Sequence, residues 1–509
     1  MGIANAWREL WKPNPQKLAR RSYAAATVNR LTSNWVTSNS SADNEILSSA
    51  RKVRSRARQL SRDSDYCKNA LRGITDNVVG TGVRLQSQVR KRGPRGNNKL
   101  DQKVNDQIET AWKKWGKKDS CHTAGKLSFD DITRTAVAAM ALDGECFIRI
   151  IRGQKFGKSD VPIALEVLEA DMVDEDYVGK SANKGWQWRM GIEVDTWQRP
   201  RNYGFLTRHP GDTLFPIGVV DDKRHIIVPA KDVIHLFKVE RPGQTRGVSW
   251  FASAIERLHH LSGFEQAELV RARASSCLMA WIQSPEAELS GDGIEDQERV
   301  YDMEPGAVRV LANGESVHVP NLDAPDGQFE PFVRAMLRAL AAGIGCSYES
   351  ISRDYSQTNY SSSRLSLLQD QEAFKALQHQ LQENLLSIIY DQWLEIAVLS
   401  GALSLPGYQQ DTDHYHKTRW LFRGWGWVDP MKEVQAYKEA VRCGFKTQAQ
   451  VIAESGGDLE ELLTARKSEI ELAESMGLKF DTEPETVTDT QTSTKVSETN
   501  PKVDDGEQT

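Results

Sequence analysis

The sequence predicts a mixed α+β protein in which two long helices flank a small β-containing insertion. Three observations lead to this fold class. A proline-free helical pattern runs from Trp250 to Ile282, and a second long apolar stripe runs from Leu365 to Trp393. Short apolar segments between residues 83 and 240 are typical of strands. An average globular helix has about 11–12 residues, so both predicted helices are long.

Length and charge limit the classes of protein that fit. A chain of 509 residues can bury sizeable cores and form more than one compact unit. The net charge of −5 argues against a general polyanion binder. Residues 1–100 differ, because 20 Lys+Arg stand there against 6 Asp+Glu, a net charge of +14. Such a segment suits nucleic acid or acidic surfaces of other subunits, and it equally suits a solvated basic surface.

The cysteines and the apolar runs predict neither a disulfide framework nor a membrane protein. The six cysteines, at 67, 121, 146, 277, 346 and 443, form no Cys-x-x-Cys pair, which favours reduced thiols in a cytosolic compartment. The first residues include Trp7, Arg8, Glu9 and Lys12 rather than the apolar core of a signal peptide. No uncharged apolar run approaches the ~18 residues of a membrane span.

The first half of the chain reads as a polar arm followed by a mixed α/β unit. Residues 1–45 are predicted to be a flexible basic arm. A basic helix is expected over Asp43–Asn77, ended by Gly80 and Gly82. After it we expect a strand at Val83–Gln86, helices at Asp101–Trp115 and Phe129–Leu142, and strands at Gly144–Ile151, Ile163–Leu168, Gly191–Val194, Gly204–Leu206, His225–Pro229 and Val233–Phe237.

The middle of the chain predicts a helix, a small β insertion and a returning helix. Ser249 can cap the first helix, whose apolar face is Ala254, Leu258, Leu261 and Phe264. Within the insertion, Asn313-Gly314 is a two-residue hairpin signal between segments 307–311 and 315–319. A helix from Phe329 to about Ile344 leads back.

The loop from Ser350 to Ser363 has an unusual composition. It holds amides, hydroxyls, two tyrosines and Arg353, with no large aliphatic side chain after Ile351. Amides and hydroxyls can contact phosphate without reading bases, and tyrosines can stack or brace. From composition alone an ordinary polar surface loop is the more frequent explanation. Asn359 and the serines after it are expected to cap the second long helix.

The C-terminal part is predicted to be helical and to end in a tail. Asp429 can cap a helix with Pro430 in its first turn, running to Cys443. Thr447 and Asp458 can cap two further helices. Residues 481–509 hold ten Ser/Thr and 2 Lys+Arg against 8 Asp+Glu, which is typical of a disordered acidic tail.

No catalytic constellation is found in the sequence. It lacks a phosphate-binding Gly-x4-Gly-Lys-Ser/Thr loop, a His-Glu-x-x-His pair and a Gly-x-Ser-x-Gly elbow. His259 and His260 are adjacent on a helix and point about 100° apart, which disfavours a shared metal. Residues 411–416 contain two aspartates and two histidines, which fit either a metal site or, more often, a solvated loop. We therefore predict a non-enzymatic protein without cofactor or metal.

Four stretches together resemble the lambda family of bacteriophage portal proteins. They are Asn77–Gly82, Pro242–Trp250 with Glu265–Ala272, Tyr355–Arg364 and Trp427–Pro430. No single stretch is decisive, but they follow one another in the family's order over about residues 15–480. The missing phosphate loop agrees with a family whose ATP hydrolysis belongs to a separate motor.

The resemblance implies a portal-type fold with named parts. On this sequence they are a flexible basic arm (1–45), a wing-like α/β body (46–246), a first stem helix (247–275), a clip (276–326), a second stem helix (327–346), a tunnel loop (347–361), a long helix and body return (362–426), crown-side helices (427–480) and a disordered acidic tail (481–509).

The resemblance also implies a function, site residues and partners. The expected protein is a twelve-fold ring at one vertex of the virion capsid, assembled in the host cytoplasm, through which double-stranded DNA is packaged and ejected. Its expected partners are further copies, the terminase large subunit, a head-completion or connector protein, and the major capsid and scaffold proteins, with no membrane. The residues expected in the channel are Arg353, Tyr355, Gln357, Thr358, Asn359 and Tyr360. Contacts between stems are expected from Glu256, Arg257, Glu265, Glu268, Arg271 and Arg273, and motor docking from Val308, Arg309, Asn313, Gly314 and Glu315.

Two other hypotheses remain at this point. One is a monomeric or dimeric nucleic-acid-binding accessory protein that uses its basic region 51–95. The other is a soluble enzyme that uses the acidic and histidine groups near 411–416. Arg353 is a positive charge that the family's tunnel loop does not lead us to expect.

Overall fold

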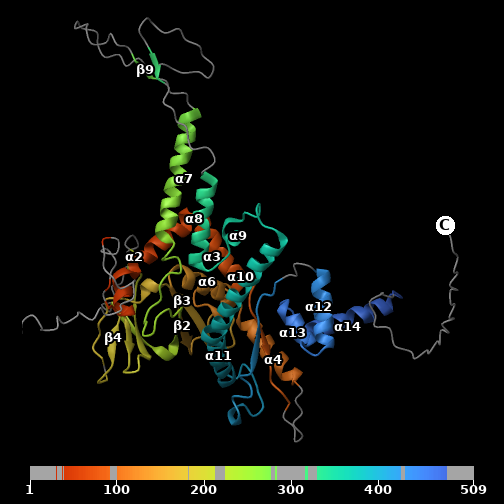
Figure 1. Ribbon diagram of the computed structural model, residues 1–509. Helices are drawn as coiled ribbons and strands as arrows, with labels where there is room; N and C mark the ends of the chain where they lie inside the picture. The colour runs from red at the N-terminus through yellow and green to blue at the C-terminus, as the bar shows by residue number, and fades with distance from the viewer. Residues whose placement is uncertain are drawn as a thin grey trace, which may run out of the picture.

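A computed structural model describes residues 39–91, 100–181, 183–212, 224–276, 281–283, 316–318, 329–425 and 430–478, with Arg30 and Thr37. The predicted mixed α+β class with long helices and a helical C-terminal part is confirmed (Figure 1). The predicted acidic tail and most of the predicted N-terminal arm lie outside the described residues. Within the described residues, no helix is both long and apolar enough to cross a membrane.

The basic N-terminal helix is two helices rather than one. Helix α2 spans Ala42–Asp63 and α3 spans Asp65–Val78. The prediction of a continuous helix was wrong because Ser64 adopts an extended conformation and caps α3, its hydroxyl accepting the N–H of Cys67 at 3.4 Å. A serine stops one helix and starts the next in this way because its side chain replaces a missing backbone partner.

Two antiparallel sheets form the β part of the body. The three-stranded sheet has the order β3-β2-β8, and the four-stranded sheet has the order β4-β5-β6-β7. A buried cluster around Phe147, Tyr203 and Phe205 joins the two sheets. The strands are β2 (Glu145–Arg152), β3 (Ile163–Leu168), β4 (Gln187–Arg189), β5 (Ile192–Val194), β6 (Pro200–Leu206), β7 (His225–Pro229) and β8 (Val233–Phe237).

The largest core lies where helices from both halves of the chain meet. It contains α4 (Gln102–Trp115) and α6 (Phe129–Leu142), the latter opened by a Ser128–Asp131 capping box. The predicted second long helix consists of α10 (Tyr360–Leu381), a π turn η4 (Gln382–Leu386) and α11 (Ser387–Leu399). It extends past Trp393, where the predicted apolar stripe ends. Trp112 meets Trp393 edge-on at 5.0 Å, so this helix is a central part of the body.

A short sheet closes the body with a strand that the sequence analysis missed. β1 (Arg84–Ser87) was expected, and it pairs antiparallel with β11 (Thr418–Leu421), with Leu85 opposite Trp420. Only four residues form β11, and two adjacent apolar residues among polar neighbours do not give the alternating pattern that predicts a strand.

Helices α7 and α8 lie side by side and project from the body (Figure 1). Helix α8 spans Phe329–Ile344, as predicted. Helix α7 spans Ile255–Ser276, so the predicted start near Trp250 was wrong. The Ser249 hydroxyl accepts the N–H of Phe251, which supports a turn over 250–254 rather than the helix. Beyond the helices, β9 (Trp281–Gln283) pairs antiparallel with β10 (Ser316–His318). The predicted hairpin strand 307–311 lies outside the described residues.

Three C-terminal helices follow on the other side of the body from the four-stranded sheet (Figure 1). They are α12 (Pro430–Arg442), α13 (Gln448–Glu454) and α14 (Leu459–Ser475). Thr447 caps α13 with a capping box, and the Asp458 carboxylate accepts the N–H of Glu460, as predicted. The remaining elements are α5 (Lys118–Cys121), α9 (Tyr348–Ser352) and the 3-10 turns η2 (Ala170–Met172), η3 (Ala230–Asp232) and η5 (Tyr408–Gln410).

Candidate functional site: the projecting helix pair and the loop that follows it

The segment 240–247 leads from the body into α7, and hydrogen bonds from its own side chains to its backbone hold it in a turn. The Gln244 amide oxygen accepts the N–H groups of Glu240 and Arg241 at 2.8 and 3.2 Å, and its amide nitrogen donates to the carbonyl of Arg246 at 2.8 Å. Thr245 donates both its N–H and its hydroxyl to Asp43, each at 2.8 Å. The turn is therefore fixed to α2 before α7 begins.

A buried ion pair lies at the base of α7. The Arg246 guanidinium donates to both carboxylate oxygens of Glu145, at distances of 2.6 to 2.9 Å, and both side chains are almost fully buried. The same guanidinium donates to the carbonyls of Met190 at 2.8 Å and Ala170 at 3.0 Å, and Gly247 donates its N–H to Glu145 at 3.0 Å. Burial opposes ionisation of Glu145, but Arg246 and His235 outweigh it and hold the pKa of Glu145 well below its ordinary value.

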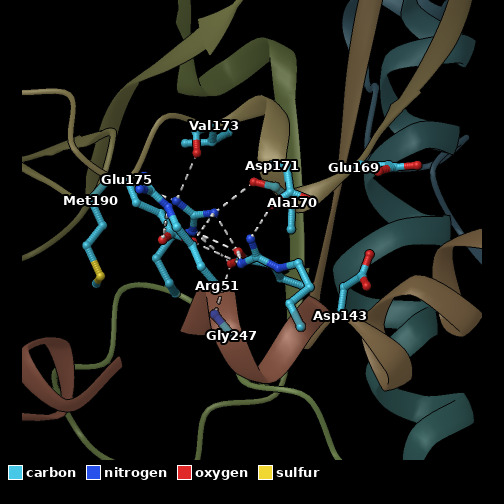
Figure 2. Close-up of polar contacts among 12 residues, drawn as sticks. Arg51, Asp143, Glu169, Ala170, Asp171, Val173, Glu175, Met190 and Gly247 are labelled. Carbon is cyan, nitrogen blue, oxygen red and sulfur yellow. Dashed lines mark hydrogen bonds and ion pairs between the residues drawn. The ribbon is translucent and has the colours of Figure 1, made fainter. Parts of the chain in front are cut away.

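Helix α2 joins this buried network through Arg54 and Arg58. Figure 2 shows Asp171 and Glu175 among the carboxylates of this region. Arg54 pairs with Glu145 at 3.3 Å, with Asp171 at 2.8 Å and with Glu175 at 3.0 Å. Arg58 pairs with Asp143 and Asp171 on the next turn of the helix. We call Arg54, Glu145, Asp171, Glu175 and Arg246 the stem-base network. Removing one partner of such a network leaves a buried charge uncompensated, which costs much more than an exposed pair contributes.

Two glycines allow the backbones to meet at this point. A Cβ on Gly247 would lie 2.1 Å from the carbonyl oxygen of Gly144, and a Cβ on Gly144 would lie 2.3 Å from the backbone of Val248. Gly144 also has φ +93°, a conformation that other residues rarely adopt. The N–H of Trp250 then donates to the carbonyl of Ala141 at 3.0 Å. The turn that leads into α7 is thus attached directly to the end of α6.

The helix pair is packed at its base and open further out. Leu258 and Leu261 of α7 are buried with Leu337 and Leu340 of α8 in a core shared with α2 and α3. Further along, Phe264 stacks on Phe329 with ring centroids 5.6 Å apart. Beyond it, on α7, Leu269 and Val270 are exposed in the single chain. The outer half of the pair therefore presents apolar surface that the described residues do not cover.

A short helix supports the loop that follows α8. Ser347 caps α9, and the buried Asp370 of α10 accepts the Ser347 N–H at 2.9 Å and the hydroxyls of Ser347 and Ser350 at 2.6 and 2.7 Å. The Asn69 amide donates to the carbonyls of Ser350 and Ile351 at 2.9 and 2.8 Å. The predicted loop 347–361 is thus irregular only over 353–359, because α9 occupies its first part and α10 begins at Tyr360.

The tip of the loop is exposed and polar. Arg353 has φ +59° and turns the chain out of α9. The Asp354 carboxylate then accepts the N–H of Ser356 at 3.0 Å and the hydroxyl of Tyr348 at 2.8 Å, and these bonds lower the pKa of Asp354 to about 2. The Tyr355 side chain is 57% exposed, and no hydrogen bond is described for its hydroxyl. Asn359 closes the loop as the cap of α10, in a capping box with Ser362.

A family model described as phage portal protein, lambda family, matches residues 28–378, which include both projecting helices and the loop. The chain belongs to the lambda family of phage portal proteins. The resemblance inferred from four stretches of sequence is thereby confirmed.

Individual relatives agree with the family match. A probable portal protein of Halomonas phage phiHAP-1 is 28% identical over 471 residues, covering 90% of this chain and 88% of the relative. Portal protein B of Escherichia phage lambda is 25% identical over 477 residues, covering 87% of this chain and 88% of the relative. Among solved structures, a chain from the neck of an empty GTA particle covers 79% of this chain and 93% of its own length, with 13% identity and a TM-score of 0.45.

The residues expected in a portal channel lie together on the loop. Arg353, Tyr355, Gln357 and Asn359 are exposed and Thr358 is half-buried, its hydroxyl donating to the carbonyl of Tyr355. Tyr360 is the first residue of α10. The guanidinium of Arg353 is directed back to Asn69, at 3.4 Å. The placement agrees with the expected surface, whereas contact with DNA stays a prediction.

The charged residues expected between portal stems lie along α7, and four of them have partners within the chain, among them Glu256, which lies 3.9 Å from His260. Glu268 pairs with Arg271 one turn later, and Glu265 accepts the hydroxyl of Tyr66 at 3.3 Å. Glu256, Arg257 and Arg273 are also on α7. The docking residues expected in the insertion, Val308, Arg309, Asn313, Gly314 and Glu315, lie outside the described residues.

The histidine and aspartate groups near 411–416 do not converge. The imidazole of His416 bonds Asp391 at 2.6 Å and the Tyr408 hydroxyl at 3.1 Å, whereas His414 interacts with Asp411 through its backbone N–H. Among the described residues, the group that could offer three metal ligands is Glu169, Asp171 and His209. Asp171 is already paired with Arg54 and Arg58, whose positive charges oppose a cation. This acidic group therefore serves ion pairs in the structure.

The stem-base network is the feature that sequence reasoning missed. Glu145 and Arg246 are 101 residues apart, and Glu145 follows a helix and opens an apolar strand. A charged residue inside such a strand pattern was the available signal, because it must find a partner when buried.

Proposed function

We propose that this chain assembles into a closed twelve-fold ring at one vertex of the capsid, and that double-stranded DNA passes through the ring during packaging and ejection. The observation that carries the proposal is the family match, which covers α7, α8 and the loop 353–359. In this proposal α7 and α8 form the stem, the loop 353–359 faces the channel, and the chain acts as a structural component of the virion rather than as an enzyme.

The exposed apolar surface supports assembly into a ring. Helices α12 and α13 have no buried residue in the single chain, and Met431 and Phe445 are largely exposed. Short helices are marginal in water unless a partner covers an apolar face. A neighbouring copy would supply that partner in the C-terminal part, and another contact would cover Leu269 and Val270 on α7. Such contacts between different surfaces of identical chains form a ring when the rotation between neighbouring copies closes.

The loop chemistry supports transient contact with DNA. Gln357, Thr358 and Asn359 can contact phosphates and Tyr355 can brace a groove, without reading the sequence. Each phosphate that a fixed cation neutralises adds affinity and slows movement, so a mostly neutral loop suits a moving duplex. Arg353 is the exception, and its bond to Asn69 keeps part of its guanidinium occupied.

The accessory nucleic-acid-binding hypothesis loses part of its basis. Arg51, Arg54 and Arg58 of the basic helix α2 pair with carboxylates of the body. These arginines therefore form ion pairs within the chain, which makes them less available to bind a polyanion.

The partners follow from the proposed ring. The insertion 276–326 would dock the terminase large subunit and later a head-completion or connector protein, and the ring's outer surface would meet capsid and scaffold proteins. Assembly would take place in the host cytoplasm before the ring becomes part of the virion.

The first experiment measures the mass of the purified chain by light scattering, with negative-stain images of the same sample. Rings of about twelve copies with a central hole are expected. A stable monomer or dimer, both alone and with scaffold protein, would contradict the ring.

A second experiment tests the loop. Deletion of residues 355–358, and separately Tyr360→Ala, should leave ring assembly unchanged and reduce DNA packaging. A deletion variant that packages as well as the parent would remove the loop from the mechanism. Gln410→Ala, on a different surface turn, is the matched control and should package normally.

A further inference from the structure

A tryptophan stands exposed at the tip of the hairpin between β5 and β6. The Trp197 side chain is 84% exposed, the largest exposed fraction among the large apolar side chains that the structure describes. Exposed indoles are uncommon on soluble surfaces, because a tryptophan buries more apolar area than most residues when it finds a pocket.

The turn that carries Trp197 is fixed by one buried carboxylate. Asp195 accepts the N–H groups of Trp197 and Arg199 on one oxygen, at 2.8 and 2.9 Å, and the guanidinium of Arg201 on the other, at 2.7 and 3.1 Å. Gln198 takes a left-handed conformation and donates its N–H to the carbonyl of Asp195 at 3.0 Å. The backbone under Trp197 is thus ordered before any partner binds, which lowers the entropic cost of association.

Exposed basic side chains predominate along the hairpin and the segment before it. From residue 177 to residue 201, both acidic residues, Glu193 and Asp195, are buried. The exposed cations of this stretch for which no ion pair is described are Lys180, Lys184 and Arg199, whereas Arg189 and Arg201 are paired with Asp43 and Asp195. The guanidinium of Arg201 also lies over the ring of Trp186, 5.6 Å from its centroid. An apolar anchor surrounded by basic side chains fits a partner with an apolar recess in an acidic surface.

The position of the hairpin indicates on which side of the ring this partner lies. The four-stranded sheet lies on the opposite side of the body from α10 and from helices α12–α14 (Figure 1). This placement rests on the proposed function, in which the loop before α10 faces the channel. The sheet that carries the β5–β6 hairpin then lies on the outward side of the ring.

We propose that Trp197 is an anchor by which the assembled ring binds an acidic protein surface that surrounds it, the inner surface of the capsid shell. The indole enters an apolar recess of that surface, and the lysines and arginines around it pair with the carboxylates at the rim of the recess. Buried tryptophans at interface centres carry a large share of binding energy, whereas rim charges mainly guide encounter. Duplex DNA offers charge without an apolar recess, so it would use the basic side chains and leave the indole exposed.

The test co-expresses the chain with the shell-forming proteins of its own virus and counts shells that contain a ring. Rings are first purified and imaged for every variant, so that failure to form a ring, which would contradict the proposed function, is separated from failure to join a shell. Trp197→Ala should form rings normally and reduce ring-containing shells about tenfold or more. Trp197→Phe should restore most of the loss.

Matched variants separate the anchor from general surface effects. Leu399→Ala removes an apolar side chain that is 73% exposed at the end of α11 and should have no effect. Lys184→Glu with Arg199→Glu should reduce incorporation, and the reduction should be larger at low salt. Incorporation of Trp197→Ala rings at the parental level would overturn the proposal.

A crosslinking experiment identifies the surface that Trp197 meets. A photo-reactive benzoylphenylalanine at position 197 is irradiated in the co-expressing cells. A crosslink to an acidic segment of the shell protein is the expected result. A crosslink to a second copy of this chain, or to DNA, would instead assign the tip to a contact between subunits or to nucleic acid and would overturn the proposal.

Discussion

Residues 240–247 and residues 353–359 flank the same projecting helix pair, yet Arg246 of the first and Tyr355 of the second lie in opposite environments. The first segment, which leads into α7, holds Arg246 at 1% exposure on a carboxylate with no exposed surface. The second segment, which follows α8, holds Tyr355 at 57% exposure. Both lie within the part of the chain that matches the family. One resemblance therefore reflects packing, and the other marks a surface available for function.

The difference follows from what each segment must do. A helix pair that projects from a body must be held at its base, and charged hydrogen bonds fix direction more strictly than apolar contacts. A loop that meets a moving partner must keep its polar groups available. The loop is supported by α9, which Asp370 and Asn69 hold through hydrogen bonds.

The largest expected effect comes from the stem-base network. Glu145→Gln keeps the shape of the side chain but leaves Arg246 and Arg54 facing a neutral group in a buried site. We expect the free energy of unfolding to fall by about 3–5 kcal/mol, or the chain to fail to fold. Urea titration followed by tryptophan fluorescence measures this.

The control for this prediction is an exposed ion pair of the same sheet. Glu166 on β3 lies 3.5 Å from Arg149, and Glu166→Gln should cost less than about 1 kcal/mol. Equal losses for the two variants would show that the buried network contributes no more than a surface pair.

The close backbone approach at the start of α7 predicts the next largest effect. Gly247→Ala places a methyl group 2.1 Å from the carbonyl of Gly144, so the two backbones must separate. The expected loss of stability is about 1–3 kcal/mol, measured in the same titration.

A glycine inside α7 itself provides a control of opposite sign. Gly263 lies inside α7 with nothing within 4 Å of a built Cβ. Alanine favours helices over glycine by about 1 kcal/mol, so Gly263→Ala should stabilise the chain. A loss at Gly263 as large as that at Gly247 would mean that α7 tolerates no added methyl group anywhere, and that the close approach is not special.

A buried histidine that bonds Glu145 of the stem-base network predicts a dependence of stability on pH. His235 is stacked between Phe147 and Phe237 and bonds Glu145 at 3.0 Å. Burial, opposed by the bond to Glu145, lowers the pKa of His235 below its ordinary value. The unfolded chain then binds a proton more readily than the folded chain, so stability is complete above the ordinary histidine pKa, about 6.5, and falls as the pH drops below it.

The measurement compares unfolding at pH 7.5 and pH 5.5. The parent should lose stability over this interval, and His235→Gln should lose less. His260→Gln, at an exposed histidine of α7, should behave like the parent. A steeper loss in His235→Gln than in the parent would contradict a neutral His235.

Much of the fold could be predicted from sequence where a local pattern determines it. The capped helices Phe129–Leu142 and Phe329–Ile344 have the predicted bounds, because caps and apolar periodicity are local signals. The break at Ser64 and the late start of α7 were missed, because capping side chains and the turn over 250–254 competed with a continuous helical pattern.

The candidate site divides in the same way. The exposed amides and hydroxyls of the loop could be found from composition, because a run without aliphatic side chains has little to bury. The partners of Arg246 could not, because they come from β2, η2 and the turn before β5, which only the tertiary fold brings together. Trp197 was not singled out either, since a tryptophan in a strand-rich segment is usually assigned to a core.

The smallest expected effect on stability is at the loop tip, and it distinguishes segment 353–359 from segment 240–247 most directly. Tyr355→Ala removes a side chain that is mostly exposed, so the free energy of unfolding should change by less than about 0.5 kcal/mol, and rings should form as in the parent. DNA packaging should nevertheless decline, because the aromatic ring that braces the duplex is gone. A stability loss of several kcal/mol would place Tyr355 with the stem-base network as a packing residue. An unchanged stability with reduced packaging would separate the two segments by function, since the same titration would show Glu145→Gln unfolding the chain that Tyr355→Ala leaves intact.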